Sequence, residues 1–361
     1  MQLSELTLHD VRSWKRVELV FDGSTAIIGG NGVGKTTLLE AAFYCATLSS
    51  FRTSSDQALI RSGTDRAVIR ATVRHLRAET IELEISARGR SRAQLGGASV
   101  SNRREILGVL RASIFAPEQQ AIIRGEPSDR RRFVDGLLVM LAPRYHQTIR
   151  EYERIVRQRN SLLRRALEEG TEPHGLEVWD EALLKTGAEL CAGRARAIEL
   201  LAPFAARAYD VVGDGGAFAI GYEARCEHPG TSDVNDWLRA LQDKLEFRRD
   251  LERIRGTTIV GPHRDDLSIT VNQLPARTHA SHGEGWLAAL ALALGSHSCI
   301  EQTIGDPPVL LLDDPFTLLD PTRRRRLAQI LPDAQVLVTA ADPAEIPAEL
   351  EARRIDAATL R

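Results

Sequence analysis

The segment AIIGGNGVGKTTLLEAAFY, residues 26–44, constrains the fold of this chain more than any other stretch. It fits the pattern G-x-x-x-x-G-K-[ST], with Gly29, Gly34, Lys35 and Thr36 at the fixed positions. An apolar run that reads as a strand precedes this loop, and a run with helical character follows it. The order of strand, loop and helix predicts a phosphate-binding loop in an α/β core, and it disfavours a chance glycine turn.

The residue types in this loop suit a nucleotide phosphate. Glycines let backbone N–H groups converge on an anion, and the following helix directs its positive end at the same anion. We expect Lys35 to reach the β- and γ-phosphates and Thr36 to place its hydroxyl on Mg²⁺. The predicted ATP-binding residues of the loop are Gly29, Gly30, Asn31, Gly32, Val33, Gly34, Lys35, Thr36 and Thr37.

A second strong signal is PVLLLDDPFTLLD, residues 308–320. Four apolar residues followed by two acids predict a buried parallel strand that ends at the nucleotide. We expect Asp313 to hold Mg²⁺ through water and Asp314 to act as general base on the attacking water, since phosphoryl transfer depends on neutralised charge and an oriented nucleophile. The alternative is a strand end whose acids cap a helix. The paired acids and the lack of an N-K-x-D motif favour ATP over GTP.

Composition excludes several classes of protein. The formal net charge is −2, so any nucleic-acid surface must be a local patch. The four cysteines (Cys45, Cys191, Cys226 and Cys299) contain no C-x-x-C pair, which argues against a zinc site or a disulfide framework. No apolar run approaches the about 18 residues of a spanning helix, and the polar N-terminus is no signal peptide. We expect a cytoplasmic protein without a membrane partner.

Periodicity indicates a core that is discontinuous in sequence. Residues 3–11 and 16–22 alternate like the strands of a hairpin, and further short strands follow the loop helix. Helical spacing dominates residues 124–256, and strands are expected to return from Thr257. We therefore predict an ATPase domain of residues 1–123 and 257–361 and a mostly helical insertion domain of residues 124–256.

Four segments together resemble one family. They are GGNGVGKTTLLEA, FAPEQQAIIRGEPSDRRRFVD, VGPHRDD and LLLDDPFTLLD. The sequence resembles the bacterial RecF recombination mediators, ABC-type ATPases related to the heads of chromosome-structuring ATPases, and looks like an actinobacterial branch. The resemblance covers essentially the whole chain. It implies an α/β ABC-type ATPase head, with a P-loop core, an antiparallel β lobe and the helical insertion.

The resemblance also implies further site residues. Ser281, Gly283 and Glu284 stand where the family's signature segment meets the γ-phosphate of a partner subunit, although the common Ser-x-Gly-Gln-Gln-Arg reads SHGEGW here. Asp320 closes a loop expected to cross the dimer. Thr339 stands at the switch position, and Arg12 near the nucleotide. For Ser281 and Thr339, a plain helix cap and a plain strand end are the alternatives.

The implied function is ATP-dependent binding of double-stranded and gapped DNA in recombinational repair and replication restart. ATP would drive formation of a homodimer, slow hydrolysis would release it, and RecR with RecO would be partners in loading a recombinase. We expect a weak, DNA-stimulated ATPase. A nucleotide-dependent scaffold with negligible turnover and an ATP-binding subunit of a transporter-type machine are the alternatives.

Several basic segments are candidates for contacts with DNA. Five arginines fall within about 120° of one another on one predicted helix: Arg150, Arg154, Arg157, Arg164 and Arg165. They could follow phosphates, or they could form an ordinary solvated face beside Glu151 and Glu153. The run 323–326 is similar and could be a helix surface. For residues 263–266 we favour a polar network that holds the returning chain.

Overall fold

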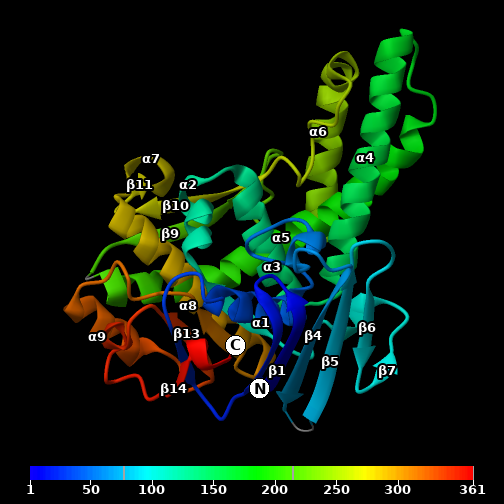
Figure 1. Cartoon of the computed structure of the whole chain (residues 1–361). Helices are drawn as coiled ribbons and strands as arrows, with labels where there is room; N and C mark the ends of the chain where they lie inside the picture. The colour runs from blue at the N-terminus through cyan, green and yellow to red at the C-terminus, as the bar shows by residue number, and fades with distance from the viewer. Residues whose placement is uncertain (76–77, 214, 361) are drawn as a thin grey trace. The chain divides into compact units, whose positions relative to one another are not determined.

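The chain packs as two compact units in a computed structural model that describes residues 1–75, 78–213 and 215–360 (Figure 1). The first unit comprises residues 1–124, 203–218 and 270–361. The second comprises residues 125–202 and 219–269. Both units are therefore assembled from segments that are distant in sequence.

A five-stranded parallel sheet forms the centre of the first unit. Its strand order is β14 (Arg353–Asp356), β3 (Thr25–Ile28), β13 (Val336–Ala340), β12 (Val309–Leu312) and β8 (Ala112–Phe115). Every residue of β8, β12 and β13 is buried, which explains their unbroken apolar runs. Helix α1 (Lys35–Thr47) packs on β8, β12 and β13, and α8 (His282–Ile304) packs on β8 and β12. The predicted strands before the loop and before the paired acids are confirmed.

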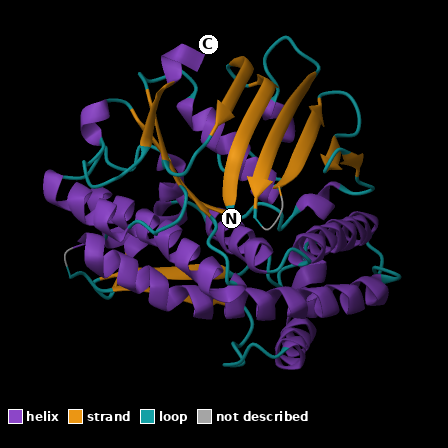
Figure 2. Cartoon of the chain, turned by 90° about the horizontal axis from the view of Figure 1, so that it is seen from below, coloured by secondary structure: helices purple, strands orange, loops and turns teal. Residues whose placement is uncertain are grey.

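An antiparallel sheet of six strands forms the other half of this unit, and Figure 2 shows its strands fanned side by side. The order is β2 (Trp14–Val20), β1 (Gln2–Val11), β4 (Arg66–Arg74), β5 (Ala78–Ser86), β6 (Arg92–Leu95) and β7 (Ala98–Ser99). Burial alternates along β1, β4 and β5, because one face of the sheet covers the core. The predicted hairpin is β1–β2.

The second unit is mostly helical, as expected from the apolar spacing. It contains α3 (Pro127–Leu141), α4 (Tyr145–Glu169), α6 (Val234–Arg255) and the first part of α5 (Leu176–Gly213). Helices α4 and α6 contact each other and run side by side in Figure 1. Strands β9 (Phe218–Glu223) and β10 (Asp266–Val271) are neighbours in a small sheet.

The remaining elements are short. They are α2 (Gln120–Arg124), α7 (Ala276–His279), α9 (Pro321–Ile330), strand β11 (Leu274–Pro275) and the 3₁₀ turns Asp56–Leu59, Arg103–Ile106, Pro117–Gln119, Pro343–Glu345 and Ala357–Leu360.

The expected return to strand at Thr257 is wrong, because β10 begins only at Asp266. The backbone N–H groups of Thr258 and Ile259 donate to the side chains of Asn160 and Glu252, at 2.7 Å each. Those donors are thus unavailable to a strand partner. Gly261 adds a φ of +123°, which L-residues rarely adopt.

The boundaries of the two units also differ from the predicted domain ranges. Residues 257–269 pack with the helical unit, and residues 203–218 pack with the first unit. Side-chain contacts of the 257–266 segment with α3, α4, α5 and α6 account for the first difference.

Two expectations about chemistry can be compared with the described residues. All four cysteines are free and buried, and burial raises the pKa of Cys45 to about 12. Among the helices of residues 1–75, 78–213 and 215–360, none combines the length and apolar character needed to cross a membrane.

Candidate nucleotide-binding site

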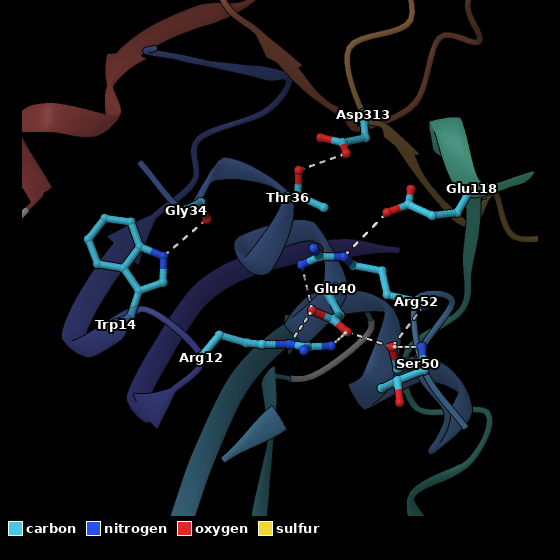
Figure 3. Close-up of polar contacts among 10 residues, drawn as sticks. Arg12, Trp14, Gly34, Thr36, Glu40, Ser50, Arg52, Glu118 and Asp313 are labelled. Atoms are coloured by element: carbon cyan, nitrogen blue, oxygen red, sulfur yellow. Dashed lines mark hydrogen bonds and ion pairs between the residues drawn. The ribbon is translucent and has the colours of Figure 1, made fainter. Parts of the chain in front are cut away.

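The glycine-rich loop leaves β3 and turns into α1 through two left-handed residues. Gly32 has a φ of +81° and Gly34 a φ of +104°. A Cβ atom at Gly34 would lie 2.5 Å from Nε1 of Trp14, and that nitrogen donates to the Gly34 carbonyl at 3.0 Å (Figure 3). Both the backbone conformation and the close indole therefore require glycine here. Trp14 supports the loop from β2 and was not predicted as a site residue.

The side chain of Lys35 folds back onto the loop that precedes this residue. Its side chain is 5% exposed, and its Nζ donates to the carbonyls of Gly29 at 2.6 Å and Gly30 at 3.3 Å. The ammonium group is thus held among the backbone groups of the loop, at the start of α1. Thr37, two residues further on, is buried, and its N–H donates to the Gly34 carbonyl at 3.1 Å.

Three polar side chains meet where β3, β12 and β13 end. Thr36 Oγ1 donates to Oδ2 of Asp313 at 2.8 Å, which Figure 3 also shows. Thr339 Oγ1 donates to Oδ1 of the same carboxylate at 2.6 Å, and it accepts from the Asp314 N–H at 2.9 Å. Residues 277 positions apart in the chain are thus brought together, as the parallel topology predicts.

The carboxylate at the centre of this cluster is poorly solvated. Asp313 is 2% exposed, and burial raises its pKa, with Asp314 and Glu118 adding to the rise. The hydrogen bonds from the hydroxyls of Thr339 and Thr36 lower the pKa of Asp313 and offset part of this rise. A carboxylate and a hydroxyl within hydrogen-bonding distance are oxygen donors of the kind that Mg²⁺ prefers, so the residues fit this ion.

Arg12, which the resemblance places near the nucleotide, forms a two-point ion pair with a carboxylate of α1. Its Nε and Nη2 donate to both oxygens of Glu40, at 3.1 and 2.7 Å (Figure 3). Glu40 lies on α1 and is fully buried. Arg52 bridges Glu40 and Glu118, at 3.5 and 3.3 Å, and Ser50 also donates to Glu40.

Sequence reasoning missed this ionic network of Arg12, Glu40, Arg52 and Glu118. Its signal was Glu40, a single acid in the apolar run TTLLEAAFY, because a buried carboxylate requires paired cations or donors. The partners themselves lie 28 and 12 residues away and could not be chosen by spacing.

The predicted signature segment begins α8. Ser281 caps the helix, since its Oγ accepts from the Glu284 N–H at 3.2 Å and its own N–H donates to Glu284 Oε2 at 2.8 Å. These hydrogen bonds lower the pKa of Glu284. A side chain at Gly283 would meet open space. The plain cap considered for Ser281 is thus present, and Glu284 stabilises the same helix end.

The side chain of Asp320 caps the N-terminus of α9. Its Oδ1 accepts from the N–H groups of Thr322 and Arg323, at 2.9 and 3.0 Å. Within the basic run that follows, Arg324 Nε donates to the carbonyls of Phe316 and Leu319. Arg324 therefore stabilises the loop that precedes α9.

The five arginines of the predicted stripe lie exposed on α4. Four of them pair with glutamates of the same helix: Arg150 and Arg157 with Glu153, Arg154 with Glu151, and Arg165 with Glu169. Ion pairs of this type are weak, but they reduce the positive charge of the face.

The predicted polar network at residues 263–266 is confirmed within the second unit. Asp265 is 1% exposed and accepts hydrogen bonds from Tyr222 and from the Arg225 N–H. Asp266 forms a two-point ion pair with Arg130, at 2.6 and 2.9 Å. His263 contacts Tyr152 at 2.8 Å.

The comparisons with known proteins agree with this geometry. The family model described as the RecF/RecN/SMC N-terminal domain matches residues 2–350. The DNA replication and repair protein RecF of Streptomyces avermitilis is 43% identical over 98% of this chain and 97% of that protein. The chain belongs to the RecF family.

Other relatives support the same assignment. The RecF protein of Frankia alni is 44% identical over 98% of this chain and 97% of that protein. The solved structure of "the recombination mediator protein RecF-ATP in RecFOR pathway" superposes with a TM-score of 0.88 at 29% identity, covering 96% of this chain and 93% of that one. A Pyrococcus furiosus Smc head domain, at 19% identity and a TM-score of 0.53 over 95% of this chain and 90% of that one, shares the fold. The expected ABC-type ATPase head is confirmed.

Proposed function

We propose that this chain is an ATP-dependent DNA-binding protein of recombinational repair and replication restart. One observation carries the proposal. The Lys35–Thr36 loop meets Asp313, Asp314 and Thr339 at one sheet edge, in a chain 43% identical to a DNA replication and repair protein.

The site residues divide the chemistry of ATP hydrolysis between them. The loop N–H groups and Lys35 would bind the β- and γ-phosphates, and Thr36 and Asp313 would hold Mg²⁺. Bound there, Mg²⁺ supplies positive charge against the phosphate oxygens. Asp314 would orient and deprotonate the attacking water, with Thr339 holding its backbone. Arg12 supports this site through Glu40 on α1.

The proposal includes a homodimer that forms with ATP. Ser281, Gly283 and Glu284 of one protomer would face the nucleotide of the other, with Asp320 in the crossing loop. An exposed helix N-terminus such as that of α8 is suited to an anion. Hydrolysis would be slow and would release the dimer.

Duplex or gapped DNA is the proposed ligand of the dimer, and RecR with RecO are the proposed partners in loading a recombinase. A solved relative at 29% identity is described as acting in the RecFOR pathway, which supports this choice.

Fluorescence anisotropy of a labelled gapped duplex tests the proposal. The protein is titrated without nucleotide, with ATP–Mg²⁺ and with ADP–Mg²⁺, at two salt concentrations. We expect tight, salt-sensitive binding only with ATP, and Lys35→Ala should remove the ATP effect because the phosphates lose their ammonium partner. If the wild type binds no DNA with any nucleotide, the proposed function is wrong.

A further inference from the structure

The second unit contains a basic cavity of about 900 Å³ that is separate from the loop of Lys35. It is walled by the start of α3, one face of α6 and the segment 257–264. Its cationic lining residues are Arg131, Arg225, Lys244, Arg248, Arg255 and Arg264. We call this feature the basic cavity.

The charge of the basic cavity is strongly unbalanced. Against its six cations the lining contains one carboxylate, Glu126, and that side chain caps α3 by accepting from a backbone N–H of its first turn. Within the described part of the chain, none of the six cations forms an ion pair with a carboxylate.

Neutral backbone carbonyls hold several of these cations in place. Arg131 Nη1 donates to the Asp265 carbonyl at 2.7 Å, and Arg264 Nη2 donates to the Thr258 carbonyl at 3.0 Å. Arg225 Nε donates to the Arg264 carbonyl at 3.3 Å. These carbonyls hold the side chains without forming ion pairs, and the carboxylates of Asp266, Asp135 and Asp265 act on Arg131 only from a distance. Cations held in this way remain available to an anionic ligand.

His263 also lines the basic cavity, and its pKa is lowered there. Burial lowers its pKa to about 4, and Arg264 and Arg131 contribute to the shift. The imidazole is therefore neutral at pH 7, and the positive charge of the basic cavity comes from the arginines and Lys244.

We infer that the basic cavity binds the sugar–phosphate backbone of DNA. Its arginines match phosphate oxygens, and the half-buried Leu251 and Ile259 add apolar surface on which a deoxyribose can pack. The α4 stripe is less suited, because four of its five arginines are paired with glutamates. The inference rests on the proposed function, since it names residues that hold the DNA.

Lysine labelling gives a direct test, because the chain has only four lysines: Lys15, Lys35, Lys185 and Lys244. The full-length protein is treated with an amine-acetylating reagent, with and without saturating duplex DNA, and the four sites are quantified by mass spectrometry. We expect DNA to reduce the labelling of Lys244 several-fold. The exposed Lys185 of the same unit and the exposed Lys15 should not change.

A competing arm separates DNA from other phosphate ligands. If inorganic tripolyphosphate protects Lys244 and bound DNA does not, the basic cavity takes a free anion and the inference is overturned. Unchanged labelling of Lys244 in a complex that anisotropy shows to be saturated with DNA overturns it as well.

A pair of double variants provides the second test. Lys244→Gln with Arg248→Gln removes two charges from the basic cavity, whereas Arg150→Gln with Arg157→Gln removes two from the α4 stripe. Each phosphate contact contributes about 0.9 to the slope of log K against log salt, so the cavity variant should lower that slope by about 2 and weaken binding at least ~10-fold.

The stripe variant should change both quantities much less, and ATP binding should be normal in both variants, because Lys35 lies in the other unit. If the cavity variant binds DNA with the wild-type affinity and salt slope, the inference is wrong while the proposed function stands. If the wild type itself binds no DNA, the proposed function fails first.

Discussion

Asp314, directly after β12, has an unusual backbone conformation. Its φ is +45°, a left-handed conformation that is uncommon for residues other than glycine. The hydroxyl of Thr339, which accepts from the Asp314 N–H, lies 3.4 Å from its Oδ1 and stabilises this turn. Because of this conformation, the side chains of Asp313 and Asp314 point in different directions at the end of β12. Asp313 accepts a hydrogen bond from Thr36.

Asp314→Asn should separate ATP binding from hydrolysis. Asparagine tolerates the left-handed conformation, so the turn should persist, but the carboxylate base is lost. We expect ATP hydrolysis to fall by about 10²-fold or more, and a dimer to persist in ATP–Mg²⁺. Steady-state ATPase assays and light scattering after size-exclusion chromatography measure these effects.

Lys35→Ala is the control for the dimer and should stay monomeric in ATP. If the Asp314→Asn variant is also monomeric in ATP, the proposed sandwich of two chains around ATP is wrong.

Helix α4 depends on one buried arginine. Arg159 is 1% exposed, and it donates to Asp180 at 2.8 Å, to Glu252 at 2.6 Å and to Thr258 at 2.9 Å. A single guanidinium thus joins α4 to α5, α6 and the segment that follows α6. Both carboxylates are buried and need a compensating cation; Glu252 pairs with Arg159, and Asp180 pairs with Arg159 and, at 3.2 Å, with Arg249.

Arg159→Met should destabilise the second unit by about 3–5 kcal/mol, because it leaves buried Glu252 without its cation and Asp180 with Arg249 alone. Urea denaturation followed by circular dichroism measures the loss. Arg157→Met, an exposed position on the same helix with a 4.0 Å pair to Glu153, is the matched control and should cost less than about 0.5 kcal/mol. Equal losses from the two substitutions would contradict this account of Arg159.

At the scale of the whole molecule, each unit contains a histidine that is neutral at pH 7, His297 fully buried and His263 partly buried. Burial lowers the pKa of His297 in the first unit, and of His263 in the second, to about 4. The unfolded chain binds these protons near the ordinary pKa of about 6.5, so folding opposes protonation between the two values. Stability from each histidine is present above pH 6.5 and is lost as the pH falls towards 4.

His297→Gln should reduce the acid sensitivity of the first unit. Glutamine can still donate to the Pro308 carbonyl, which His297 Nε2 contacts at 3.0 Å, but it cannot be protonated. Between pH 6.5 and 4, the wild type should lose up to about 1.4 kcal/mol per pH unit relative to the variant.

Denaturant titrations at several pH values check this difference. The comparison with the variant is needed because burial raises the pKa of Asp313 and Asp265, which acts in the opposite direction. A wild type and variant that respond equally to pH would contradict a neutral His297.

Local sequence determined much of the first unit. The loop glycines, Lys35 and Thr36, the strands before the loop and before Asp313, and the buried helix α8 were all predicted. Each of these depends on interactions within a few residues: a left-handed glycine, an unbroken apolar run, or a repeat of helical or strand period. The convergence of Thr36 with Asp313 and Thr339 also followed, because parallel strands place their carboxyl ends at one edge.

Only the tertiary structure decided which charged groups meet. Arg12 pairs with Glu40, Arg159 with Glu252, and Arg130 with Asp266, across separations of 28, 93 and 136 residues. The basic cavity likewise combines residues from α3, α6 and the loop after α6. No periodicity relates such positions. Burial decides the outcome, because a charge removed from water needs a partner, and the partner is whichever oppositely charged group the fold brings within reach.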